Sequence, residues 1–195
     1  GLRIGGLTTL KTLEECLDLA DFSEALSVEY GMNVRNSLSL SNFLAQADGR
    51  SPGLCCLISL GSKIVSLKNS KAISLVQFMT EKSQDDHVID LFLPEPISLA
   101  FERVGRSPKD LPIVCVSTAK SEDGSIQVAV GGAKEVKSPF SLHNFDDDGL
   151  EEIKAIFADA DDDWASAEYR QEVGAVLLSR ALQKLHLQAG LQEAK

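Results

Sequence analysis

The side chains of this chain that could do chemistry are few, and none forms an established catalytic motif. The sequence contains no Walker A loop, no HExxH, no GxSxG and no Cys/His set at metal-binding spacing. His87, His143 and His186 stand apart from one another and from the cysteines, so we interpret them as ordinary residues. Gly131-Gly132 follows a strand-like run and would permit a close phosphate approach, but a pair of glycines alone favours a β-bulge or a strand exit.

Two acidic runs, 146–148 and 159–163, are the remaining candidates for a site. Several carboxylates close together suit Ca²⁺, but neither run has the alternating ligands, central glycine and closing Glu of an EF-hand loop. Carboxylates are also stabilised at the positive N-terminal end of a helix. We therefore predict that both runs are solvated caps of the helices that follow them.

The hydrophobic pattern of the first half predicts alternating strands and helices. Apolar and β-branched runs predict strands at 2–7, 63–67 and 87–93, and helical spacing predicts helices at 10–19, 21–30, 54–60 and 74–79. Thr8 or Thr9 is the expected cap of the first helix, and Gly31 is the expected C-terminal glycine of the second. The Ser- and Asn-rich range 33–53 has little helical period and predicts a long loop.

The second half predicts a three-stranded antiparallel sheet packed on helices. Strands are expected at 99–104, 113–119 and 126–131, with Asp123-Gly124 forming the hairpin before the last of them. Helices are expected at 150–158 and 166–187. The longer helix has apolar residues at three-to-four spacing, which predicts one core face and one solvated face; these are Val173, Val176, Leu177, Ala181, Leu182 and Leu185.

Composition limits the function classes. The chain has 195 residues, 44% of them hydrophobic, which suffices for one sizeable core or two small ones. Its net charge of −10 repels phosphate, so we expect no nucleic-acid binding and no adhesion to anionic membranes. With no membrane-span-length apolar run, no signal peptide and four cysteines lacking CxxC spacing, we expect a cytoplasmic protein with reduced, buried thiols. Because Gly1 replaces an initiating Met, we also expect the natural protein to extend further at its N-terminus.

Four stretches, taken in order, resemble one known family. They are IGGLTTL at 4–10, VRN at 34–36, the passage 101–133 that starts FERVGRSPKD, and SAEYRQEVGAVLLSRAL at 166–182. Their order and spacing are similar to the flavin (medium) subunit of the molybdenum hydroxylases, the xanthine dehydrogenase and CO dehydrogenase group. The resemblance implies an α+β fold: residues 1–96 as the second subdomain of a PCMH-type FAD domain, and 97–195 as a CO dehydrogenase flavoprotein C-terminal-like domain.

The same resemblance implies an FAD site between two subdomains, the first of which would precede Gly1. The family's second cradle loop reads approximately RN-x-A-T-I-G-G-N-L-A, and this chain keeps Arg35, Asn36 and a hydroxyl at Ser39. Asp110 matches a position where the family often has Asp. These four residues are the cofactor-binding candidates, although Arg35, Asn36 and Ser39 are equally consistent with a loop fixed by its own hydrogen bonds, and Asp110 with a local cap or a pair to Arg103 or Arg106.

Four departures from the family pattern argue against FAD binding by this chain alone. Ser41 and Asn42 replace the two glycines, Phe43 replaces the family's Asn, and Pro52 replaces an Asp. Glycines let backbone N–H groups approach phosphate oxygens, whereas a side chain occupies that space, and proline also removes a donor. We interpret the loop as a degenerate flavin-phosphate loop.

The leading functional hypothesis is a degenerate flavin-subunit homologue that acts as a structural or interaction component beside molybdopterin-binding and iron–sulfur subunits. The alternative is an active FAD-binding electron-transfer subunit whose first subdomain is supplied elsewhere. A small-molecule module using a groove between the two halves is a third hypothesis. No catalytic constellation is evident in the chain itself, and Tyr169-Arg170 is expected to pack the last helix on the sheet.

Overall fold

The first half of the chain builds one antiparallel sheet. The computed structural model describes residues 1–83, 85–95, 98–121, 123–145 and 148–193. The strands β1 (Leu2–Gly5), β2 (Lys63–Ser66), β3 (Ile73–Ser74) and β4 (Val88–Leu93) have the order β1-β4-β2-β3. Leu91 of the central strand β4 lies opposite both Ile4 and Ile64, and all three are buried. The alternation of the strands therefore directs one face of this sheet into the core.

Six helices accompany this sheet: α1 (Leu10–Leu17), α2 (Ala20–Glu29), α3 (Met32–Arg35), α4 (Leu40–Gln46), α5 (Pro52–Ser59) and α6 (Leu75–Glu81). Thr9 caps α1 by accepting a hydrogen bond from the amide of Thr12, as predicted. Gly31 directly follows Tyr30, the C-cap of α2, as predicted, but its φ of −63° is not left-handed and it also serves as the N-cap of α3. The left-handed residue of this region is Asp18 at the end of α1.

The predicted loop at 33–53 was also wrong, because α4 and the start of α5 lie within it. Leu40, Phe43 and Leu44 occur at helical spacing and are fully buried. Ser39 begins the helix as its N-cap. The serine and asparagine content had concealed a short helix that is stabilised by packing rather than by propensity.

The second half forms the other sheet, with strand order β5-β6-β7-β8 and every pairing antiparallel. Its strands are β5 (Ser98–Val104), β6 (Val114–Lys120), β7 (Ile126–Gly131) and β8 (Phe140–Leu142), followed by α7 (Leu150–Ile156) and α8 (Ala167–Glu193). Three strands were expected, but the sheet has a fourth, β8. This strand was missed because its three residues are too few to show a periodic signal. The predicted hairpin at Asp123-Gly124 joins β6 to β7, and Gly124 has φ +85°. Glu122 lies outside the described residues.

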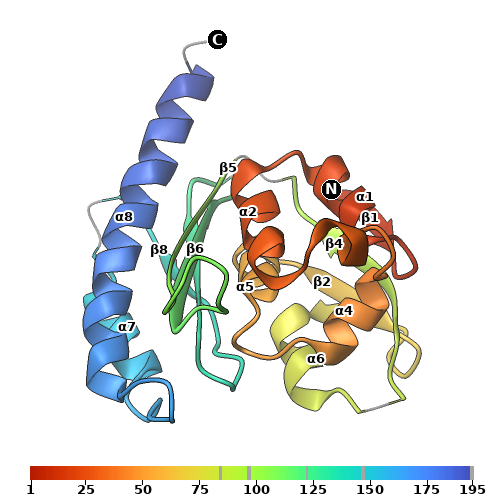
Figure 1. The fold of residues 1–195 in the computed structure, drawn as a ribbon. Helices are drawn as coiled ribbons and strands as arrows, with labels where there is room; N and C mark the ends of the chain where they lie inside the picture. The colour runs from red at the N-terminus through yellow and green to blue at the C-terminus, as the bar shows by residue number, and fades with distance from the viewer. Residues whose placement is uncertain (84, 96–97, 122, 146–147, 194–195) are drawn as a thin grey trace.

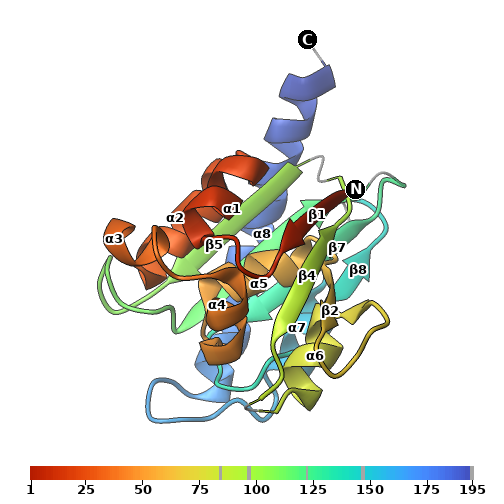
Figure 2. The ribbon, with the colours of Figure 1, turned by 90° about the vertical axis from the view of Figure 1, so that its right-hand side faces the viewer.

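Helix α5 lies between the two sheets, and all eight of its residues are buried (Figure 1). A helix that is apolar on every side belongs in an interior. Its small residues allow a close approach to the second sheet: the Cys55 thiol donates to the carbonyl of Ala129, and the hydroxyls of Ser59 and Ser117 are 2.7 Å apart. One core thus includes residues from both halves, while a second core lies between the β5–β8 sheet and α8. Figure 2 looks at the molecule from the side of the first half, and α8 lies behind the β5–β8 sheet. The division at residue 96 remains a prediction.

The four cysteines are free thiols, and three of them are buried as predicted. Burial raises the pKa of Cys56. Cys16 is exposed, contrary to the prediction, because the buried face of α1 is formed by Leu10, Leu13 and Leu17.

None of the described helices has the length and apolar character that crossing a bilayer would require. In the longest of them, α8, Val176 was expected on the core face but is 51% exposed.

A partly buried carboxylate, that of Glu29, joins α2 to the start of α5. Glu29 Oε2 accepts a hydrogen bond from the Ser51 hydroxyl at 2.7 Å, and the Gly53 amide also donates to this carboxylate. Burial raises the pKa of Glu29, and the hydrogen bonds from Ser51, Gly53 and Tyr30 offset this only in part.

This raised pKa predicts a pH dependence of stability. A carboxyl group whose pKa is higher in the folded state binds its proton more tightly there, so its contribution to the free energy of unfolding falls as pH rises from its unfolded value through its folded value. Relative to Glu29→Gln, the wild-type chain should lose stability from pH 4.5 upward, as measured by urea unfolding at several pH values. Glu152→Gln, which removes an exposed charge on α7, is the control; the same trend in both variants would contradict a specific role of Glu29.

Candidate functional site

Two segments that the family resemblance singles out lie side by side; we call them the loop pair. The first is residues 5–9, from the last residue of β1 onward, and the second is residues 38–42, which lead into α4 and form its first turn. Thr9 and Ser39 form an isolated antiparallel bridge. The Leu10 amide donates to the Leu38 carbonyl at 2.9 Å. The backbone at Gly6 passes close to Val88 of β4. Only glycine allows this approach, because a Cβ at this position would lie 1.9 Å from the carbonyl oxygen of Val88.

The first four amides of α4 are all engaged within the chain. The Leu40 amide donates to the Thr8 carbonyl and the Ser41 amide to the Gly6 carbonyl, both at 2.8 Å. The Asn42 amide donates to the Ser39 hydroxyl at 3.3 Å, and the Phe43 amide donates to the Ser39 carbonyl at 2.8 Å. Such amides are the usual anion-binding groups of a helix start. Here they hold the loop pair together.

The residues that replace the family's glycines and Asn are built into this packing. Ser41 is 6% exposed, and its hydroxyl accepts the Val88 amide at 3.1 Å. Phe43 is fully buried and contacts the Tyr30 ring edge-on. Asn42 is exposed, and Pro52 is the first residue of α5. Ser41 and Phe43 therefore stabilise the fold at positions where the family pattern has groups that approach a cofactor.

The other predicted cofactor residues are divided between two parts of the chain. Arg35 is buried and its guanidinium bonds Glu14 at 2.6 Å, which leaves its Nε without a partner among the described atoms. Asn36 is exposed directly after α3. Asp110 lies between β5 and β6 and is 3.9 Å from the guanidinium of Arg106, one of the two local partners expected. Cofactor binding by Arg35, Asn36, Ser39 and Asp110 remains a prediction.

The acidic runs hold no metal cluster in the part of the chain that is described. Asp148 accepts the Leu150 amide, and Asp161 accepts the Ala167 amide at the start of α8, so both cap helices as predicted. Asp146 and Asp147 lie outside the described residues. Gly132, with φ +113°, ends β7 as the predicted strand exit.

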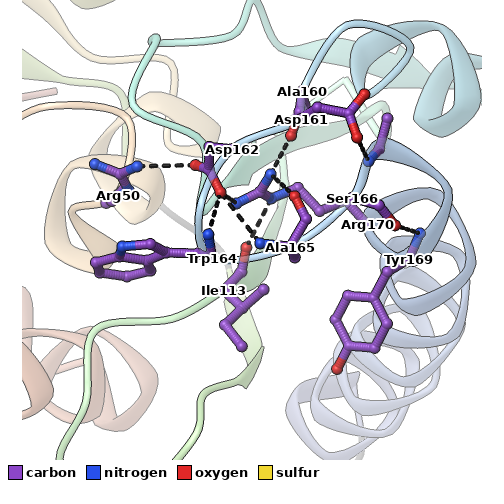
Figure 3. Close-up of polar contacts among 11 residues, drawn as sticks. Arg50, Ile113, Ala160, Asp161, Asp162, Trp164, Ala165, Ser166, Tyr169 and Arg170 are labelled. Atoms are coloured by element: carbon purple, nitrogen blue, oxygen red, sulfur yellow. Dashed lines mark hydrogen bonds and ion pairs between the residues drawn. The ribbon is translucent and has the colours of Figure 1, made fainter.

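An ionic cluster around the buried Arg170 side chain is the feature that sequence reasoning missed (Figure 3). The Arg170 side chain is fully buried, and its guanidinium donates to the Asp162 carboxylate at 2.6 Å. It also donates to the backbone carbonyls of Ile113, Ala160 and Ala165. One feature of the sequence could have indicated that Arg170 is buried: it is spaced four and seven residues from Gly174 and Leu177, which lie on the core face of α8. Tyr169-Arg170 was expected to pack the last helix on the sheet, and this is confirmed for Arg170.

Asp162 is solvent-accessible, as predicted, but its carboxylate also takes part in ion pairs that the prediction did not include. Its second oxygen accepts from Arg50 at 2.8 Å, and Arg50 also lies over the Trp164 ring (Figure 3). Burial alone would raise the pKa of Asp162, but hydrogen bonds from Arg170, the Trp164 amide and Arg50 outweigh it and hold this pKa below its usual value. The cluster thus fastens the loop before α5 to the start of α8.

The comparisons with known proteins bear on the fold. No protein-family model and no curated protein sequence matches the chain. Quinoline 2-oxidoreductase from Pseudomonas putida 86 is similar in structure, with a TM-score of 0.72 and 17% identity over 94% of this chain and 74% of that chain. The reconstituted CO dehydrogenase from Oligotropha carboxidovorans gives a TM-score of 0.69 and 16% identity over 95% and 75%. CO dehydrogenase from Hydrogenophaga pseudoflava gives 0.67 and 14%, again over 95% and 75%. These likenesses confirm the implied fold at the coarse level: the chain has the fold of a chain found in quinoline 2-oxidoreductase and in CO dehydrogenase. The two subdomains that the resemblance implied remain a prediction.

Proposed function

We propose that this chain is a flavin-subunit homologue of a molybdopterin-dependent hydroxylase that no longer binds FAD and acts as a structural or interaction component. Its partners would be molybdopterin-binding and iron–sulfur subunits. The shared fold supports membership of this oxidoreductase group. The loop pair supports the loss of the cofactor.

The observation that carries the proposal is the engagement of the α4 amides. A pyrophosphate at this loop needs N–H donors, but the carbonyls of Gly6 and Thr8 and the hydroxyl of Ser39 already accept them. The side chain of Ser41 stands at a glycine position and is itself bonded to β4. This arrangement does not fit a bound flavin pyrophosphate.

We expect the purified chain to be colourless and to show no saturable binding of added FAD, because the amides of Leu40, Ser41 and Asn42 at the start of α4 are already engaged within the chain. The measurement is calorimetric titration with FAD, combined with flavin fluorescence. Micromolar or tighter binding by the wild-type chain would overturn the proposal.

A matched variant separates the two causes of the loss. Ser41→Gly/Asn42→Gly restores the glycines but leaves the Gly6 and Thr8 carbonyls in place, so this variant should also fail to bind FAD. If only the variant binds, the missing glycines rather than the engaged amides explain the loss. Circular dichroism would check that the variant is folded, because it loses the Ser41 hydroxyl that accepts the Val88 amide.

The alternative is an active FAD-binding electron-transfer subunit that is completed by another chain. The observation in its favour is coverage, because this chain covers 74% of the similar quinoline 2-oxidoreductase chain, which therefore contains further residues. Co-purification with molybdopterin-binding and iron–sulfur subunits tests the partner proposal. FAD in such a complex, bound against this chain, would favour the alternative.

A further inference from the structure

Three of the four cysteines lie together where the two halves of the chain meet. Cys55 and Cys56 belong to α5 and Cys115 belongs to β6, and the three residues are 3%, 0% and 0% exposed. All three are free thiols, and the proposed function assigns them no role. Two thiols that approach each other across such a junction have the chemistry for a covalent link between the halves.

Cys55 and Cys115 share one space beside β7. Cys115 lies opposite Gly131 in the pairing of β6 with β7. A Cβ at Gly131 would lie 2.9 Å from Sγ of Cys115 and 3.6 Å from Cβ of Cys55, so both side chains border the room that this glycine leaves. A hydrogen bond between the two thiols, together with burial, raises the pKa of Cys55. The two sulfur atoms are therefore neighbours.

The other two cysteines are not placed to compete for this contact. Cys55 and Cys56 are consecutive residues of a helix, so their side chains point in different directions and do not face each other. The thiol of Cys56 has its own hydrogen bond with Ser117. Cys16 is exposed on α1, outside this buried group.

We infer that Cys55 and Cys115 form a disulfide when the chain meets a small disulfide oxidant such as oxidised glutathione, and that this bond locks the two halves together. One thiolate attacks a sulfur atom of the oxidant and releases the first glutathione thiol. The second thiolate attacks the mixed disulfide, forms the bond between Cys55 and Cys115, and releases the second glutathione thiol. The chain gives up two protons and two electrons, and the oxidant becomes two thiols.

Burial controls the rate of this reaction. The thiolate is the reacting form, and both sulfur atoms are enclosed between α5 and the second sheet. Oxidation therefore proceeds from molecules in which α5 has briefly moved away from β6. When α5 returns, the bond is again enclosed, and it restricts the unfolded chain between residues 55 and 115. The oxidised chain should consequently resist urea better than the reduced chain.

Thiol counting after oxidation tests the pairing. In a Cys16→Ser background, which removes the exposed thiol, the folded chain is incubated with excess oxidised glutathione, then unfolded in N-ethylmaleimide and weighed. It should carry one adduct instead of three, and trypsin should release peptide 51–63 linked to peptide 110–120. Three adducts, or a link that forms only in urea, would overturn the inference.

Two variants identify the cysteine of α5 that reacts, and a stability measurement tests the lock. Cys56→Ala should give the same linked peptides, whereas Cys55→Ala should keep its remaining thiols free. Loss of thiols in Cys55→Ala, or no link in Cys56→Ala, would refute the pairing. The urea midpoint of the oxidised chain should rise and return to the reduced value with dithiothreitol; an unchanged midpoint would refute the lock. None of these measurements involves FAD, so their outcome is separate from that of the proposed function.

Discussion

Arg170→Met should lower the free energy of unfolding by about 3 kcal/mol, the low end for breaking a buried ion pair, because the guanidinium is fully buried but the Asp162 side chain is 24% exposed. Methionine fills much of the same space but donates no hydrogen bond. The carbonyls of Ile113, Ala160 and Ala165 lose their donor, and Asp162 loses its closest cation at 2.6 Å. Urea unfolding followed by circular dichroism measures the change.

Two further variants separate the geometry of this cluster from its charge. Arg170→Lys keeps the charge but cannot reproduce the planar fork that serves four acceptors, so most of the loss should remain. Arg180→Met removes an exposed cation from the same helix and, in dilute solution, should change stability by about 0.5 kcal/mol or less. A loss below about 1 kcal/mol for Arg170→Met would mean that the cluster contributes little to the fold.

Gly132→Ala should be at least as damaging, at about 4 kcal/mol, because two costs coincide. Gly132 has φ +113°, which side-chain-bearing residues rarely adopt, and a Cβ there would lie 2.1 Å from the carbonyl oxygen of Ile113. Its amide also donates to the Gly49 carbonyl at 2.8 Å, which holds the loop before α5 against the end of β7. The same urea assay reports the loss.

Other glycines of the chain provide graded controls for this prediction. Gly124 has φ +85° but open space around its Cα, so Gly124→Ala should cost only the backbone strain, about 1 kcal/mol. Gly31 has neither a positive φ nor a neighbour within 4 Å, so Gly31→Ala should have little effect. Equal losses for Gly132→Ala and Gly124→Ala would show that the backbone moves to accept the methyl group.

The elements predicted correctly from the sequence are those whose apolar pattern spans several turns or alternations. The strands around Leu91 and Val116 and the helix holding Leu177 and Leu185 are of this kind. Two short elements were missed, the seven-residue α4 and the three-residue β8. Each carries little periodic signal, and polar residues in and around it obscure that signal.

The candidate site was predictable in part for a different reason. The pairing of Thr9 with Ser39 joins segments distant in the chain, and only the family resemblance indicated that they belong together. The hydrogen bonds that engage the α4 amides depend on exact backbone positions, which side-chain patterns do not specify. The Arg170 cluster was missed because an isolated arginine and an acidic run look solvated until the fold brings them together.

The complete burial of α5 has a consequence for how the chain folds. One side of this helix is covered by elements of the first half and the other side by β6 and β7. Loss of either half would expose a thiol- and leucine-lined surface, so the halves gain and lose their structure as one cooperative unit. We therefore expect that a piece ending near residue 96 does not fold by itself, even though its sheet is complete.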